Sequence, residues 1–273
     1  MKIAPLLEAW AGIRTPVIGM LHLLPLPGSP AFDGELRRVT ERLMSDAEAL
    51  AAGGVHGMML ENFGDAPFFP RRVPAYVTAY ITRLACDVKR RFDLPLGVNV
   101  LRNDGVAALS AAAAAGADFI RVNVLCGARV TDQGVTVGIA HRLSRVRAHL
   151  GATRVRILAD INVKHSSALG APRAIEDEFV ETIERGGADA VIVSGSATGK
   201  PADLIELREV KRAAGRIPVF IGSGIKPETI RSYLPEADGF IVGTSLKRDA
   251  IPDGPVDAER VKTLMRALDG KIE

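Results

Sequence analysis

The sequence predicts an α/β fold in which the chain closes into one (β/α)8 barrel, or TIM barrel. Three observations favour this class: eight short apolar runs alternate with amphipathic spacers, four of the runs share a local pattern, and polar residues gather where the runs end. A strand followed by a helix, repeated eight times over about 250 residues, is typical of this barrel. We therefore expect a single domain over residues 1–273, with residues 1–14 as an N-terminal extension.

Four of the predicted strands begin in the same way. A helix end breaks at Gly, Ala or Pro, an Asp or His follows, and an apolar run of five or six residues begins. Such a run is too short for a helix and suits a strand that is buried on both faces. These segments are 52–62, 114–124, 185–195 and 235–244.

The other four predicted strands lie between them, and three carry Pro at their start, where a strand tolerates it. The spacers have helical periodicity, as in Leu36, Val39 and Leu43. A doubly wound open sheet is the second candidate fold, but it gives no reason for two alternating strand classes, whereas alternate barrel strands feed alternate interior layers. The second class comprises segments 15–22, 94–104, 155–165 and 217–224.

Composition narrows the class of protein. The chain has 35 Lys and Arg against 32 Asp and Glu, a net charge of +3, and no basic run interleaved with aromatics, so we expect no nucleic-acid partner. Its two cysteines, Cys86 and Cys126, cannot form a disulfide framework, and a reducing compartment suits them. No stretch approaches the roughly 18 apolar residues of a membrane span. These features predict a cytoplasmic protein without membrane insertion.

Polar residues are expected at the C-terminal mouth of the barrel. Side chains alternate faces along a strand, so the position of each polar residue can be counted along its run. Barrel enzymes place their chemistry at this mouth. Arg121 lies one layer deeper, where it either closes a structural ion pair with Glu61 or Asp160 or binds an anion. The predicted substrate-binding residues are His22, Asn99, Asn123, Asn162 and Arg121.

Two glycine turns predict a phosphate site. They follow the seventh and eighth strands, whose loops commonly bind phosphate in this fold, and glycine lets backbone N–H groups approach an anion. Lys226 and Lys247 could add positive charge. The alternative is that the glycines only allow tight turns. The predicted phosphate-binding residues are Gly222, Ser223, Gly224, Gly243, Thr244 and Ser245.

Acid–base chemistry is predicted for Glu61, Asp160 and Lys164. A carboxylate and an amine that converge in the mouth suit a general base and its electrostatic partner, and a desolvated Lys could form a Schiff base. A structural Asp–Lys pair is the alternative. We predict no cofactor and no metal ligands. A divalent ion between His22, His165, Asp160 and Glu61 stays open as an alternative, although no close histidine spacing supports it.

Two loops stand out by their length or content. After Glu61, residues 61–74 place Phe68, Phe69, Arg71 and Arg72 beside Asp65, which suggests a lid or substrate wall, or else a partner interface. Residues 125–138 suggest a small hairpin around Asp132-Gln133-Gly134, with Cys126 at its base.

Eight ordered blocks, which extend over most of the chain, resemble the BtpA/SgcQ family. The resemblance implies a TIM barrel similar to the ribulose-phosphate-binding barrels. In cyanobacteria the family is tied to photosystem I accumulation or assembly, and other relatives are linked to sugar or nucleoside metabolism. The blocks are 19–30, 60–68, 97–104, 130–138, 159–165, 193–200, 221–230 and 237–247.

Two functions follow as expectations. The first is an enzyme that acts on a phosphorylated sugar or nucleoside-derived metabolite, by lyase, isomerase or glycosyl-bond chemistry. The second is a non-catalytic assembly or regulatory factor of the photosystem I biogenesis type. Barrels of this type commonly oligomerise, and the Ala-rich stretch 107–115 suits close packing between subunits. We therefore also expect a homo-oligomer.

Overall fold

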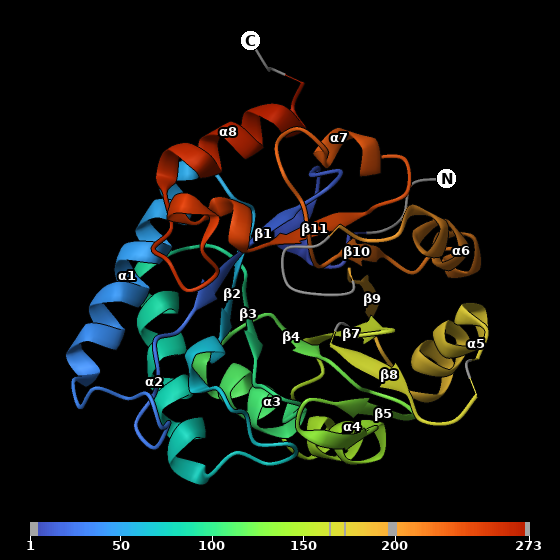
Figure 1. Ribbon diagram of the computed structural model, residues 1–273, viewed down its shortest axis with the longest axis horizontal. Coiled ribbons are helices and arrows are strands. Elements are labelled where there is room, and N and C mark those ends of the chain that lie inside the picture. Colours follow the sequence, from blue (N-terminus) through green and yellow to red (C-terminus); the bar gives the residue numbers. More distant parts are fainter. Residues whose placement is uncertain (1–4, 164, 172, 196–200, 271–273) are drawn as a thin grey trace.

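Eight parallel strands form a closed barrel, and helices cover its outside (Figure 1). The computed structural model describes residues 5–163, 165–171, 173–195 and 201–270. Around the ring the strands run β1-β11-β10-β9-β7-β4-β3-β2, which is chain order when the ring is followed backwards from β1. The predicted TIM barrel is therefore confirmed.

Each barrel strand lies inside one of the eight predicted apolar runs. Nearly every strand residue is buried, because the interior side chains fill the barrel and the outer ones pack under helices. The strands are β1 (Val17–His22), β2 (Gly57–Glu61), β3 (Leu96–Asn99), β4 (Phe119–Val122), β7 (Arg156–Ile161), β9 (Ala190–Val193), β10 (Val219–Ile221) and β11 (Gly239–Val242).

The helices bury their apolar stripes against the barrel. Asp104 caps one of them by accepting a hydrogen bond from the Ala107 N–H, and Gly116 ends it in a left-handed conformation at φ 70°. The helices are α1 (Leu36–Gly53), α2 (Ala75–Arg91), α3 (Gly105–Ala115), α4 (Ala140–His149), α5 (Ile175–Val180), α6 (Leu204–Ala214), α7 (Ile230–Tyr233) and α8 (Ala258–Leu268).

The N-terminal segment closes the bottom of the barrel. A short 3-10 helix, η1 (Glu8–Trp10), places the Trp10 ring 5.9 Å from the Phe119 ring and 6.1 Å from the Phe220 ring, measured between centroids. The indole N–H donates to the His56 carbonyl at 2.7 Å. A Cβ on Gly97 would lie 2.1 Å from the Phe119 ring, so this glycine leaves room for the ring on which Trp10 packs.

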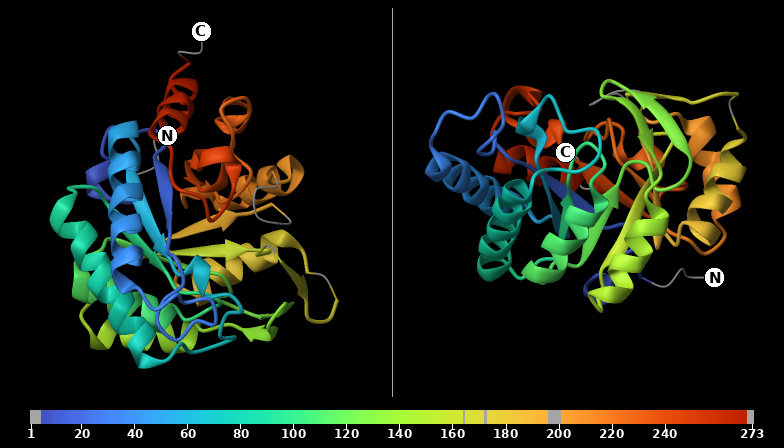
Figure 2. Two further views of the ribbon diagram at one scale, coloured as in Figure 1. Left: turned by 60° about the vertical axis from the view of Figure 1, so that its left-hand side comes forward. Right: turned by 90° about the horizontal axis from the view of Figure 1, so that it is seen from below.

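A small antiparallel sheet stands beside the mouth. The predicted hairpin is confirmed as β5 (Ala128–Thr131) and β6 (Gly134–Val137), and β8 (Ser166–Ala168) adds a third strand in the order β6-β5-β8. The hairpin and the N-terminal segment lie on opposite sides of the molecule (Figure 2). Among the described helices, none is both long enough and apolar enough to cross a bilayer.

Candidate functional site

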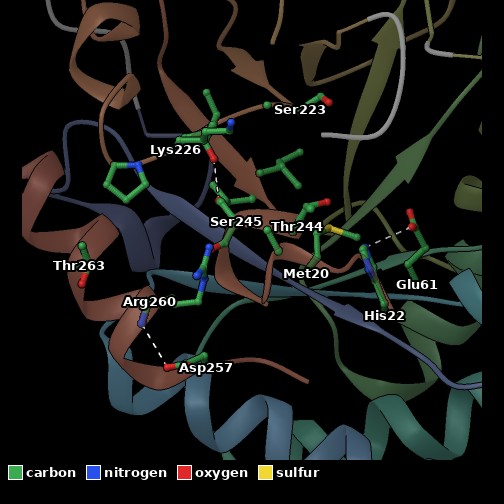
Figure 3. A pocket seen from close by; sticks show the side chains of 18 of the residues that line it. Met20, His22, Glu61, Ser223, Lys226, Thr244, Ser245, Asp257, Arg260 and Thr263 are labelled. Atoms are coloured by element: carbon green, nitrogen blue, oxygen red, sulfur yellow. Dashed lines mark hydrogen bonds and ion pairs between the residues drawn. The ribbon is translucent and has the colours of Figure 1, made fainter. Parts of the chain in front are cut away.

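A cavity of about 560 Å³ opens at the C-terminal mouth of the barrel (Figure 3). The ends of β1, β2, β10 and β11 form its floor and walls, and α8 contributes its outer edge. Ten residues that the sequence singled out line it, namely His22, Glu61, Arg121, Gly222, Ser223, Gly224, Lys226, Gly243, Thr244 and Ser245.

The two glycine turns lie side by side, because β10 and β11 pair in the sheet. The Ser245 hydroxyl donates to the Ile225 carbonyl at 2.6 Å and joins the turns directly. Gly224 has a φ of +69°, a backbone conformation that side chains disfavour. Within the described part of the chain, the amides of Gly224, Thr244 and Ser245 find no backbone acceptor. These three residues line the cavity, and unpaired N–H groups are what an anion site requires.

Positive charge at the turns comes from Lys226 and Arg260. The Arg260 Nε–H donates to the Ser245 carbonyl at 2.9 Å, which holds the guanidinium beside the turn. The expectation for Lys247 is wrong. This side chain is fully buried, points away from the cavity and pairs with Asp46 at 3.3 Å. The 3-10 helix η4 (Thr244–Leu246) follows the glycine and turns Lys247 towards α1.

A buried His–Glu–Asn group forms the opposite end of the cavity. Asn99 Nδ2 donates to Glu61 Oε2 at 2.6 Å, and His22 Nε2 lies 3.7 Å from Glu61 Oε1. His22 Nδ1 lies 2.7 Å from the Pro252 carbonyl oxygen. Because a carbonyl only accepts, the proton of the neutral ring resides on Nδ1, and Nε2 faces the Glu61 carboxylate.

Phe63 forms the aromatic wall. Its ring stacks on His22 at a centroid distance of 4.4 Å and an angle of 14°. From the loop 61–74, only Glu61 and Phe63 are among the described residues that line the cavity, so the expected wall of Phe68 and Phe69 is not formed there. Asp65 instead accepts from the Leu26 N–H at 2.8 Å and from Asn62 at 3.0 Å, and burial raises its pKa.

The partner of Arg121 is Asp160. The guanidinium makes two hydrogen bonds to the carboxylate, at 2.9 and 2.7 Å, inside the barrel. Burial works to lower the pKa of Arg121, but the charge of Asp160, its hydrogen bonds and the charge of Glu61 together outweigh burial and raise the pKa. Asn123 and Ser194 donate to the same carboxylate at 2.8 and 2.9 Å. Four hydrogen bonds occupy Asp160, which leaves it poorly placed to take a proton.

The remaining predicted residues lie elsewhere. Asn162 accepts from Arg129 and donates to Glu206 at 3.2 Å, beside a second cavity of about 210 Å³ that Asn123 and Asp160 also line. Asn99 reaches the main cavity only through Glu61. Lys164 lies outside the described residues.

Metal and thiol chemistry receive little support from the described side chains. No group of three or more His, Cys, Asp and Glu residues among them is placed to share a metal ion, so the open alternative with His22, His165, Asp160 and Glu61 does not form there. The Cys126 thiol faces the Glu181 carbonyl at 3.6 Å. Burial first, and then the charge of Glu181, raise its pKa, which disfavours a reactive thiolate.

The loop between β11 and α8 is anchored to α1 and supports the site. Buried Asp46 on α1 accepts from the Val256 N–H at 2.8 Å and from Arg42 Nε at 3.0 Å, besides pairing with Lys247. The same loop supplies the Pro252 carbonyl that holds His22. Asp46, Phe63 and Arg260 were not predicted, since two occur within charged helices and the third in an aromatic loop.

Fold and site together define a class: a TIM barrel with a polar cavity at its C-terminal mouth. The chain belongs to the BtpA family, whose model matches residues 13–270. It is 46% identical to the photosystem I biogenesis protein BtpA of Synechocystis over 93% of this chain and 88% of that protein. It is also 46% identical to an uncharacterised protein of Thermococcus kodakarensis, over 92% and 94%.

Solved structures share the fold at low sequence identity. N-(5'-phosphoribosyl)anthranilate isomerase from Pyrococcus furiosus superimposes with a TM-score of 0.56 at 14% identity, over 94% of this chain and 99% of that one. The 7,8-dihydropteroate synthase from Vibrio fischeri gives 0.57 at 16%, over 99% and 98%. These likenesses support the barrel and not a particular reaction.

Proposed function

We propose that this protein is an enzyme that acts on a phosphorylated sugar or a nucleoside-derived phosphate. One observation carries the proposal: a single cavity joins two adjacent glycine turns, with open amide groups, to a buried His–Glu pair. An anion grip and an acid–base group on opposite sides of one space suit a substrate that is held by its phosphate while its sugar reacts.

The phosphate would lie against the amides of Gly224, Thr244 and Ser245, with Arg260 and Lys226 nearby. Charge-assisted hydrogen bonds to such an oxyanion are roughly twice as strong as neutral ones. Gly243 lets the ligand approach His22, because a Cβ there would lie 3.3 Å from the imidazole Cε1. The expected phosphate-binding residues thus keep their proposed roles.

Glu61 is the group that we propose to move a proton. His22 faces one carboxylate oxygen and Asn99 holds the other, so the carboxylate is oriented before substrate arrives. The Oδ1 atoms of buried Asn99 and Asn123 have no hydrogen-bond partner among the described residues. Neither side chain lines the main cavity, so we propose that Asn99 acts on the substrate through Glu61 and that Asn123 acts from the second cavity. Proton abstraction, aldol-type cleavage and glycosidic-bond chemistry all use such a group.

The other predicted catalytic and binding residues take revised or unchanged proposed roles. Asp160, with its four hydrogen bonds, is proposed to position Arg121 and Asn123 at the base of the mouth. Asn162 is still proposed to bind substrate, and Lys164 is still proposed to take part in acid–base chemistry. The proposal assigns no metal and no organic cofactor to the site.

The test is a titration with ribose 5-phosphate and with inorganic phosphate, followed by thermal unfolding and calorimetry. Ligands that bind the folded state raise the unfolding temperature. Thr244→Asp places a negative charge in the turn and should abolish the rise, since like charges repel. Thr229→Asp is the matched control, because Thr229 lies before α7 and outside the cavity lining. A titration without any response would overturn the proposal.

A second candidate is a non-catalytic assembly or regulatory factor. The name of the Synechocystis relative favours it, and so does the mutual neutralisation of Arg121 and Asp160 in the mouth. This function predicts that a Glu61→Gln/Asp160→Asn variant still binds its protein partner. Loss of partner binding in a folded variant would argue against it.

We also propose that the protein is cytoplasmic and that copies of it associate. Free Cys86 and Cys126 support a reducing compartment. Val130, Val135 and Val137 of the small sheet are 40, 44 and 43% exposed, an apolar face that suits contact with another copy. Light scattering of the purified chain tests the association, and a monomer at all concentrations would refute it.

A further inference from the structure

The cavity does not end at the two glycine turns. Thr244 and Ser245 lie in its middle, with His22 and Glu61 on one side and with Arg260 and Thr263 on the other (Figure 3). We call the part beyond the turns the outer arm. It is lined by Lys226, Pro227 and Glu228 from the loop after β10, and by Glu259, Arg260 and Thr263 from α8.

Two cations, Lys226 and Arg260, line the outer arm. Among the described residues, neither Lys226 nor Arg260 forms an ion pair, and both line the cavity. The Arg260 guanidinium is tethered through Nε alone, which leaves its two Nη groups for a ligand. Three acidic residues line this part of the cavity: Asp257 accepts from the N–H groups of Glu259 and Arg260 at the start of α8, Glu259 pairs with Lys262 at 2.7 Å, and Glu228 remains.

A simple sugar phosphate would leave this arm empty. With its phosphate on the turns beside Arg260 and its sugar towards Glu61, it has no atoms that continue along α8 to Thr263. A second phosphate attached to the first would lie between Lys226 and Arg260, where a planar guanidinium suits phosphate oxygens. Whatever that second phosphate carries would continue along Thr263 towards solvent.

We propose that the ligand of this site is a pyrophosphate-linked sugar, with its sugar at Glu61 and its second phosphate in the outer arm. The proposal rests on the proposed function, which it narrows from phosphorylated metabolites in general to those with an internal phosphate. Such a substrate would fill the cavity on both sides of the glycine turns, with its sugar on the Glu61 side and its second phosphate on the Arg260 side.

The experiment compares inorganic phosphate, ribose 5-phosphate and ADP-ribose by calorimetry on the full chain. ADP-ribose contains the same ribose 5-phosphate, joined through a pyrophosphate to adenosine. One or two additional charge-assisted hydrogen bonds should make it bind at least about tenfold more tightly than ribose 5-phosphate. Thr263→Trp fills the outer arm and should remove this advantage, while the affinity for ribose 5-phosphate stays the same.

Arg266→Trp is the control for the bulky substitution. Arg266 is exposed on the same helix and lies outside the cavity lining, so this variant should bind all three ligands like the parent chain. If ribose 5-phosphate binds and ADP-ribose binds no more tightly, the inference fails and the proposed function survives. An advantage that persists in Thr263→Trp also overturns it. If none of the three ligands binds, the proposed function itself fails.

Discussion

Single residues show how much of the mouth can be deduced from alternation along a strand. The inward position of Arg121 was expected from its spacing, and Asp160 was one of its two expected partners. The misplacement of Lys247 has a physical reason: the residues between it and Gly243 form a 3-10 turn, so strand alternation no longer applies. Asp46 lies on a helix rich in charges, and its sequence context is that of a solvated face.

His56 should make the stability of the fold depend on pH. Burial lowers its pKa from the ordinary 6.5, although the charge of Asp269 opposes this, and its Nδ1 accepts from the Val17 N–H at 3.0 Å. The unfolded chain therefore takes up a proton more readily. Stability from this residue is complete above pH 6.5 and is lost as the pH falls below it.

The check is the urea midpoint measured from pH 8 down to pH 5. His56→Asn keeps an acceptor for the Val17 N–H but cannot titrate, so its midpoint should fall less steeply below pH 6.5 than that of the parent chain. His149→Asn alters an exposed histidine and should leave the curve unchanged. Identical slopes for His56→Asn and the parent chain would contradict the assignment.

At the scale of elements, the apolar runs predicted all eight barrel strands, because a strand buried on both faces has a continuous apolar sequence. The hairpin β5–β6 was predicted from its turn. Strand β8 was not, since Ser166–Ala168 is three residues long and has no apolar pattern. The mouth loops were predicted only in outline, because contacts such as Phe63 on His22 depend on loop paths that no periodicity determines.

The ion pair between α1 and the loop after β11 should be a large contributor to stability. Asp46→Asn leaves Lys247 buried without its counter-charge, and breaking a buried pair costs about 3–5 kcal/mol. Burial lowers the pKa of Lys247 while Asp46 opposes this, so losing the carboxylate favours the neutral amine. The double variant Asp46→Asn/Lys247→Met should be more stable than Asp46→Asn alone.

Urea unfolding of the parent chain, Asp46→Asn, Lys247→Met and the double variant measures the coupling free energy between the two side chains. Asp33→Asn is the matched control, because Asp33 pairs with Arg38 at the surface and its loss should cost less than about 1 kcal/mol. If Asp46→Asn lowers the free energy of unfolding no more than Asp33→Asn does, the Asp46–Lys247 pair does not hold the loop in place.

At the scale of the whole molecule, the N-terminal segment is part of the barrel, although the sequence presented it as an extension. Trp10 is the only tryptophan of the chain and is 1% exposed. Trp10→Ala should lower the free energy of unfolding by about 3–5 kcal/mol, because it empties the base of the barrel. Ile205→Ala, at a side chain that is 68% exposed, should change it little.

In the parent chain, Trp10 fluorescence and far-ultraviolet circular dichroism should change over the same range of urea. Coincident transitions would support the single domain that we propose. A fluorescence change that precedes the loss of secondary structure would show that the segment detaches first and is an appendage.

Trp10 closes the base of the barrel, at the end away from Glu61. In the enzyme that we propose, substrate and product would therefore enter and leave on the same side, through the C-terminal mouth. We expect the product of such an enzyme to inhibit it in direct competition with the substrate.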